Sequence, residues 1–245
     1  MNSGPKPRYD LKQYASADAL AHSVASGLIE KFEAAERDRQ PMHIALSGGR
    51  ISRNLFQALT QLAAARGLSL NTIHFFWADE RCLPPTDPES NFYTANELLF
   101  QPLNIATAQI HRIRGEAAPA AAAEQAEQEI RRVVAADPNG QPGLDLILLG
   151  LGEDGHVASL FPGESEAAVA SPAVYRAVLN SPKPPPARVT LGFCAIAAAK
   201  EVWMLASGSG KERALSAALA GEDNPFGRVL RERPCTQIFS DIHGG

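Results

Sequence analysis

The residues best suited to chemistry lie in a glycine-rich turn in the middle of the chain. The apolar run Leu144–Leu149 predicts a buried strand, and the turn after it contains three glycines and delivers Asp154 and His156. An imidazole with an ordinary pKa of about 6.5 can remove a proton from water near neutral pH. A titratable histidine on a turn after a buried strand is typical of the catalytic edge of an open α/β sheet. The pattern predicts that His156 is a general base, with Asp154 to orient it.

The segment after His156 bears on the protonation of the imidazole. Residues 157–160 predict the start of a helix, whose positive end would favour the neutral imidazole that accepts a proton. Two other interpretations are open: His156 can be a structural hydrogen-bonding group, or it can bind a metal together with Glu153 and Asp154. The remaining histidines are dispersed and form no helix-spaced pair. We therefore expect no metal site.

A second glycine turn has the composition of an anion site. Ser47, Gly48 and Gly49 stand between a predicted strand at 42–46 and a predicted helix. Glycines allow backbone N–H groups to approach an anion, and a helix N-terminus adds partial positive charge. The turn suits a phosphate group, and Arg50 adds a cation directly beside it. A tight turn without a ligand is the alternative, because two adjacent glycines are a weakly specific signal.

Three further cations complete the candidate site. Arg81 can clamp a phosphate or a developing oxyanion, with Asp79 and Glu80 holding it in place, although a solvated charged turn is the alternative. Lys211 follows a Gly-Ser-Gly segment that resembles part of a phosphate loop. It lacks the GxxxxGK[ST] spacing, which disfavours nucleotide hydrolysis. Arg188 is the third cation, and we expect it to bind phosphate together with Lys211.

The order of the predicted elements indicates an α/β fold. Short strands are predicted at 42–46, 72–77, 144–149, 174–179, 188–192, 201–206 and 236–239, and helices at about 16–38, 50–67, 91–100, 117–136 and 212–221. Strands alternating with helices favour a mostly parallel sheet with helices on both faces. The carboxyl ends of parallel strands share one edge, so we expect convergence of the segments 47–50, 78–91, 150–156 and 207–211. No linker or repeat is evident, which predicts a single domain over 1–245.

Composition restricts the class of protein. The 245 residues have a formal net charge of −4 and show no basic stripe, which argues against nucleic acid as a partner. No apolar run approaches the roughly 18 residues that cross a membrane, and the first eight residues contain no secretory apolar region. The three cysteines form no CxxC pattern, which fits reduced thiols in a cytoplasmic protein.

Taken together, these motifs resemble those of the 6-phosphogluconolactonases. The matching segments, in chain order, are Leu46–Gly49, Trp77–Arg81 with Pro84, Asp87, Ser90 and Asn91, Leu149–Pro162, Arg188–Leu191, and Gly208 with Lys211. The resemblance implies a Rossmann-like α/β fold, shared with glucosamine-6-phosphate deaminases. It also implies hydrolysis of 6-phospho-D-glucono-1,5-lactone to 6-phosphogluconate in the pentose phosphate pathway, without a metal or organic cofactor. His156 would then activate water, and the Ser47–Gly49 loop, Arg188 and Lys211 would contact phosphate.

The chain also departs from the family pattern. Arg50, Ile51 and Ser52 stand where Ser-Thr-Pro is usual, and Val157 replaces a threonine. These changes affect the expected loop geometry and affinity more than the reaction. The absence of a GxSxG elbow argues against an acyl-enzyme.

Three questions stay open at this point. An amino-sugar-phosphate deaminase or isomerase on the same fold is the first alternative function, and a non-catalytic sugar-phosphate sensor is the second. The role of Arg81, on phosphate or on the oxyanion, is undecided. The sequence is equally compatible with a monomer and with a homodimer, and it predicts a small sugar-phosphate lactone as the partner.

Overall fold

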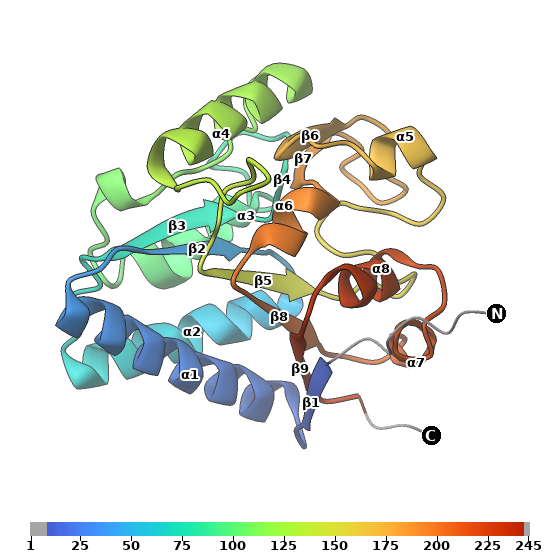
Figure 1. Ribbon diagram of the computed structural model, residues 1–245. Helices are drawn as coiled ribbons and strands as arrows, with labels where there is room; N and C mark the ends of the chain where they lie inside the picture. Colours follow the sequence, from blue (N-terminus) through green and yellow to red (C-terminus); the bar gives the residue numbers. More distant parts are fainter. Residues whose placement is uncertain (1–8, 243–245) are drawn as a thin grey trace.

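A six-stranded parallel sheet forms the centre of the molecule (Figure 1). The computed structural model describes residues 9–242, so the first eight residues, with their expected lack of a secretory signal, lie outside it. In spatial order the strands are β1 (Tyr9–Gln13), β9 (Thr236–Ser240), β8 (Glu201–Ala206), β5 (Leu146–Gly150), β2 (Met42–Leu46) and β3 (Ile73–Trp77). The expected strands of this sheet are confirmed, and β1 is an addition that the sequence did not reveal. The Rossmann-like α/β architecture is confirmed as well.

The strand order reverses between β2 and β5. The chain runs outward from β2 to β3, then returns to place β5, β8 and β9 on the other side of β2. Ligands in open α/β sheets bind at such a switch point, outside the carboxyl ends of the strands. Pairing between β2 and β5 covers only Ile44 with Leu146 and Ala45 with Ile147, whereas β2 pairs with β3 along its whole length. The two central strands therefore separate toward their carboxyl ends, where a crevice can open.

Helices cover both faces of this sheet (Figure 1). The helices among residues 9–242 are α1 (Ala17–Asp38), α2 (Arg50–Arg66), α3 (Asn91–Ala95), α4 (Pro119–Val133), α5 (Glu166–Val169), α6 (Phe193–Ala198), α7 (Glu212–Leu219) and α8 (Pro225–Glu232). The short α5 lies beside β6 (Tyr175–Val178) of a second, smaller sheet (Figure 1). A π-helical turn over Asn96–Phe100 extends α3, and a 3₁₀ turn covers Thr107–Gln109. Buried apolar side chains from both faces and the sheet form one continuous core.

The long helix α1 shows how local sequence sets these elements. The hydroxyl of Ser16 accepts a hydrogen bond from the N–H of Ala19 and caps the helix. Leu20, Val24 and Leu28 recur at four-residue spacing, and all three are fully buried against the sheet. No helix among residues 9–242 is long and apolar enough to cross a bilayer.

A second, smaller sheet lies beside the first and corrects the expectation for two strands. It contains β4 (Asp79–Arg81), β7 (Arg188–Leu191) and β6 (Tyr175–Val178), and every pairing in it is antiparallel. Residues 179–187, which join β6 to β7, number only nine. A parallel connection needs a crossover of a dozen or more residues, so this loop imposes the antiparallel arrangement. The segment 78–91, for which the sequence predicted no strand, contributes β4.

The expected helix after His156 is wrong. Residues 157–160 form a tight turn closed by a bond from Leu160 N–H to the Val157 carbonyl, and Ala158 adopts a left-handed φ of 50°. The N–H of Ser159 donates to Thr190 Oγ1 on β7, and Pro162 follows soon after. A helix over these residues would lose that tertiary bond and would soon meet a residue without an N–H. The short helices α5, α6 and α8 were also not predicted.

Candidate active site

A pocket of about 200 Å³ lies at the carboxyl ends of the central strands, at the switch point between β2 and β5. It is lined by Ser47, Gly48, Gly49, Arg50, Ile51, Asp79, Arg81, Asn91, Gly150, Leu151, Gly152, Glu153, His156, Ala158, Lys183, Arg188 and Lys211. The expected convergence of four segments is therefore confirmed, because each of them contributes to this lining. Its volume is below the roughly 300–1,000 Å³ of sites for drug-sized ligands. The pocket suits a small polar molecule.

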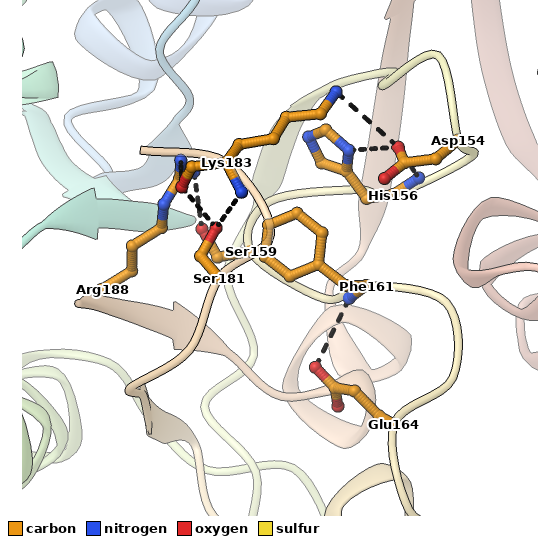
Figure 2. A network of polar contacts seen from close by, with 8 residues as sticks. All are labelled: Asp154, His156, Ser159, Phe161, Glu164, Ser181, Lys183 and Arg188. Carbon is orange, nitrogen blue, oxygen red and sulfur yellow. Dashed lines mark hydrogen bonds and ion pairs between the residues drawn. The ribbon is translucent and has the colours of Figure 1, made fainter. Parts of the chain in front are cut away.

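His156 and Asp154 form a hydrogen-bonded pair at this pocket (Figure 2). The Nδ1 of His156 lies 2.5 Å from Oδ1 of Asp154, and the N–H of His156 donates to the same oxygen at 3.3 Å. A carboxylate only accepts hydrogen bonds, so Nδ1 must hold the proton. In the neutral ring Nε2 is then the unprotonated nitrogen and the proton acceptor. The ring also packs on Phe161, with centroids 4.8 Å apart.

The turn that presents this pair depends on close backbone approach. A Cβ added to Gly152 would stand 2.0 Å from Nδ1 of His156 and 2.7 Å from Oδ1 of Asp154. Gly155 has a φ of +83°, in the left-handed region that favours glycine. The N–H of Gly152 donates to the His156 carbonyl and closes the turn. Glycine at 152 therefore makes room for the histidine–aspartate pair itself.

Burial, and not a helix dipole, keeps the imidazole neutral. Loss of water around His156 lowers its pKa below the ordinary value, and the charge of Lys183 lowers it further. The hydrogen bond and negative charge of Asp154 act in the opposite direction, as does Asp79. Because the first effect is the largest, His156 is uncharged at neutral pH. The protonation state expected from the sequence is retained, but its physical cause is different.

The glycine turn after β2 presents the N-terminus of α2 to the pocket. A Cβ on Gly48 would stand 1.8 Å from Oδ1 of Asn91, so only glycine fits between the two segments. Gly49 is the N-cap of α2, and in the part of the chain that the structure describes no side chain caps this helix. Its first turn contains no acidic residue. Backbone N–H groups and the helix dipole are thus available to an anion. The hydroxyl of Ser47 donates instead to the Leu148 carbonyl at 2.8 Å and ties β2 to β5.

Arg50 and Lys211 bring positive charge to the same end of the pocket. Burial lowers the pKa of the Lys211 ammonium, and the nearby charge of Arg50 lowers it further, whereas Glu153 raises it. Lys211 is the N-cap residue of α7, and no side chain of residues 9–242 caps that helix either. Two cations and the N-terminus of α2 therefore face this end.

Arg81 also lines the pocket, and the acidic residues beside it act elsewhere. Nη1 of Arg81 donates to the Glu89 carbonyl, and its buried Nε has no hydrogen-bond partner within residues 9–242. The sequence suggested that the Glu80 carboxylate holds this guanidinium, but it does not. It accepts bonds from the N–H groups of Arg81, Asn91 and Phe92 and from the hydroxyl of Ser90. Burial raises the pKa of Glu80 to about 7 against these four bonds, which favour the ionised form.

Asp79 is buried in the pocket wall and links two parts of the site. Its Oδ2 accepts a hydrogen bond of 2.7 Å from the hydroxyl of Ser159. Asn91 donates to the Asp79 carbonyl at 2.8 Å. Neither bond involves Arg81, so Asp79 fixes the loops around the pocket and does not anchor that guanidinium.

Lys183 is a residue of the site that the sequence analysis missed. Its Nζ lies 4.0 Å from Oδ1 of Asp154, and the structure brings it from the proline-rich loop between β6 and β7 (Figure 2). Arg188, at the start of β7, is buried and donates to the carbonyl oxygens of that loop. The sequence did contain a signal for Lys183: four prolines surround this lysine shortly before Arg188, which was already an expected site residue.

Two further observations delimit the site. Within residues 9–242 no three His, Cys, Asp or Glu side chains gather as metal ligands would. A larger depression of about 640 Å³ lies beside α4, but Arg112 and Arg132 in its lining each make two hydrogen bonds to a glutamate, Glu116 and Glu129 respectively. Its charges are therefore largely satisfied within the protein, unlike those around His156.

The fold and the pocket define an α/β protein that holds a histidine–aspartate pair among cations at the switch point of a parallel sheet. The chain belongs to the glucosamine-6-phosphate isomerase/6-phosphogluconolactonase family, whose model matches residues 15–239. It is 35% identical over 210 residues to a protein of Streptomyces coelicolor named 6-phosphogluconolactonase. The match covers 83% of this chain and 80% of that relative.

Solved structures agree with this assignment. A 6-phosphogluconolactonase from Trypanosoma cruzi is similar with a TM-score of 0.85 and 27% identity, over 98% of this chain and 97% of that one. A monomeric glucosamine-6-phosphate deaminase shares the fold at 20% identity, with a TM-score of 0.78 over 94% of this chain and 97% of its own. The fold thus supports both chemistries, and the site must distinguish them.

Proposed function

We propose that this protein hydrolyses 6-phospho-D-glucono-1,5-lactone to 6-phospho-D-gluconate, as a step of the oxidative pentose phosphate pathway. The observation that supports this most strongly is the His156–Asp154 pair, whose neutral imidazole stands in a pocket that also contains five cationic side chains. A general base suits hydrolysis of the ester bond, and cationic side chains in the same small pocket suit the phosphate group of a phosphorylated ester. The names of the relatives point to the same reaction.

In this mechanism His156 activates water. Nδ1 stays bound to Asp154, and Nε2 takes a proton from the water that attacks C1 of the lactone. The electron pair of the carbonyl bond moves to its oxygen and forms a tetrahedral oxyanion. When this intermediate collapses, the bond between C1 and the ring oxygen breaks, and the imidazolium returns its proton to the ring oxygen. Asp154 stabilises the transient positive charge on the imidazole.

The phosphate is assigned to the end of the pocket formed by the N-terminus of α2. There the backbone of Gly48 and Gly49 and the side chains of Arg50 and Lys211 offer N–H donors and positive charge. Ser47 contributes its backbone, because its hydroxyl is bonded to Leu148. Each charge-assisted contact is worth about 1.5–3 kcal/mol, so a few of them anchor a sugar phosphate with C1 toward His156.

The opposite end of the pocket is assigned to the sugar ring. Arg81, Arg188 and Asp79 line the pocket, and the charges of Asp79 and Arg81 both act on Arg188. Of the five N–H donors of Arg188, three serve the loop between β6 and β7 and one serves the hydroxyl of Ser159, which leaves one Nη1 hydrogen within the described chain for a substrate oxygen. For Arg81, the phosphate or the carbonyl oxygen of the lactone is the proposed partner.

Turnover of freshly prepared lactone tests the proposal. The purified protein should open 6-phosphoglucono-1,5-lactone much faster than the spontaneous reaction does, and it should release no ammonia from glucosamine 6-phosphate. Ammonia release would support the deaminase instead. Binding of the phosphorylated product without turnover of the lactone would support a sensor.

The proposal extends to the setting of the reaction. The partner is a small sugar-phosphate lactone, and the chain acts through one domain over 1–245, without a membrane or nucleic acid as partner. The cytoplasm is the proposed compartment, in keeping with three free thiols at Cys82, Cys194 and Cys235.

A further inference from the structure

Arg188 uses most of its donors on one loop (Figure 2). Its guanidinium makes three hydrogen bonds of 3.0–3.1 Å to the carbonyls of Lys183, Pro184 and Pro185. A fourth, of 3.4 Å, goes to the hydroxyl of Ser159, which is itself bonded to Asp79. The ring of Phe161 packs beneath the guanidinium at 5.8 Å. Arg188 is only 4% exposed, so this cation mainly organises protein.

The loop needs such a partner because of its sequence. Four of the six residues of Ser181–Pro186 are prolines, which have no N–H to donate. The loop therefore cannot satisfy its carbonyls through a backbone ladder, and a buried guanidinium with five donors can. Ser181 provides further hydrogen bonds within the loop. Its N–H donates to the Pro186 carbonyl, and its hydroxyl donates to the Lys183 carbonyl and accepts from the Lys183 N–H.

These contacts fix the main chain of Lys183 and direct its side chain to the histidine–aspartate pair (Figure 2). The ammonium lies 4.0 Å from Oδ1 of Asp154, and the side chain is 42% exposed. Its charge lowers the pKa of His156, against the opposing charges of Asp154 and Asp79 that face the same ring. Lys183 is therefore a cation of the pocket lining that lies in direct contact with the histidine–aspartate pair, through Asp154.

Two other donors near the His156–Asp154 pair are already engaged. The N–H of Gly152 closes its own turn on the His156 carbonyl. Nη1 of Arg81 is bonded to the Glu89 carbonyl, and its Nε, although without a partner among residues 9–242, is buried. Lys211, in turn, lies in the field of Arg50 at the end assigned to phosphate. A flexible ammonium that is half-exposed and already beside Asp154 can instead move onto a substrate oxygen.

We propose that Lys183 supplies the positive charge for the carbonyl oxygen of the lactone as it becomes negative, and that Arg188 is the positioning residue that presents Lys183. This inference rests on the proposed function. When water attacks C1 and His156 takes its proton, the carbonyl electron pair moves to the oxygen that faces the Lys183 ammonium. When the ring bond breaks, the same oxygen becomes part of the product carboxylic acid, which then ionises.

The variant Lys183→Gln tests the first part. We expect kcat to fall by about ten- to a hundredfold, somewhat less than for a fully buried oxyanion donor because Lys183 is half-exposed. KM should change by less than about threefold, because the contact strengthens only in the transition state. The pKa of His156, followed by NMR in the enzyme without substrate, should rise. Lys200→Gln is the matched control, because Lys200 contacts Asp145 at 2.6 Å, before the start of β5 and away from the pocket.

A double-mutant cycle tests the second part. Arg188→Gln should lower kcat and raise the pKa of His156 in the same directions as Lys183→Gln, and it should cost much less when Lys183 is already glutamine. Ser181→Ala loosens the same loop more gently and should show the same non-additivity, so the cycle stands even where Arg188→Gln fails to fold.

The outcomes separate this inference from the function on which it rests. A wild-type protein that does not accelerate lactone opening defeats both. Wild-type turnover with an unchanged kcat in Lys183→Gln, or with a rise in KM alone, overturns the role of Lys183. Additive effects of the Lys183 and Ser181 variants overturn the role of the loop.

Discussion

The substitution Gly152→Ala should disable the active site through a single methyl group. The added Cβ would stand 2.0 Å from Nδ1 and 2.2 Å from Cε1 of His156. To restore an ordinary contact of about 3.4 Å, the ring must move by about 1.4 Å. The same methyl group would stand 2.7 Å from Oδ1 of Asp154, so the hydrogen bond between the two side chains cannot be kept. The general base is thereby displaced from the water that it must deprotonate.

A displacement of this size costs roughly a hundredfold in rate, which corresponds to about 2.7 kcal/mol in the activation free energy. Gly152 is not among the glycines with positive φ, so alanine brings no backbone strain of that kind and the fold should persist. We therefore expect a collapse of kcat with little change in the free energy of unfolding.

Initial rates with fresh lactone, corrected for spontaneous opening, measure the effect, and thermal unfolding confirms the fold. Gly143→Ala is the control, because its Cβ would meet only the Ala135 carbonyl at an ordinary 3.5 Å, before the start of β5. If Gly152→Ala kept a kcat within about threefold of this control, the account of the histidine–aspartate pair would be refuted.

Four other predictions follow from the same contacts. His156→Ala should lower kcat by roughly 10²- to 10⁴-fold, whereas the exposed His22→Ala should not change it; equal rates would remove His156 from the mechanism. Because a base must be unprotonated, kcat/KM should fall with decreasing pH only below the ordinary histidine pKa. Asp154→Asn removes a charge that raises the pKa of His156, so this variant should show the acidic decline of kcat/KM at still lower pH. Lys211→Ala should raise KM for the phosphorylated lactone by roughly tenfold or more but leave the unphosphorylated lactone unaffected, and equal effects on both would contradict the phosphate assignment. Burial acts to raise the pKa of Asp145, but hydrogen bonds from His43 and Lys200 outweigh it and hold the pKa at about 2. The stabilising contribution of Asp145 is therefore present above the unfolded value of about 4 and is lost as pH falls toward 2, and acid unfolding of Asp145→Asn should be less steep.

Local sequence predicted the parts of the site that depend on neighbours in the chain. Asp154 and His156 are two residues apart in a glycine turn, so their contact needs no tertiary partner. Gly48 and Gly49 stand directly between a strand and a helix, and a parallel sheet brings such turns to one edge whatever the details of packing. These expectations required only the order of the elements and the spacing of the residues.

The sequence failed where a residue's partner is distant in the chain. Glu80 was expected to hold its neighbour Arg81, but its carboxylate caps α3 instead, where buried N–H groups need an acceptor. The helix expected over 157–160 has the required composition, yet the N–H of Ser159 is drawn to Thr190 Oγ1, 31 residues away. The three donors that Arg188 gives to a proline-rich loop with few N–H groups were not foreseen from the sequence, and its expected contact with phosphate stays a prediction.

By itself, the sequence determined the histidine–aspartate contact and the glycine turns, because each is set by backbone conformation over a few residues; the role of His156 as base stays a prediction. Only the tertiary structure decided which charges face that base. The antiparallel sheet brings Lys183 to within 4.0 Å of Asp154, and burial sets the pKa of His156. Electrostatic interactions and desolvation depend on distances through space, and those distances are fixed only when the sheets, loops and helices have packed together.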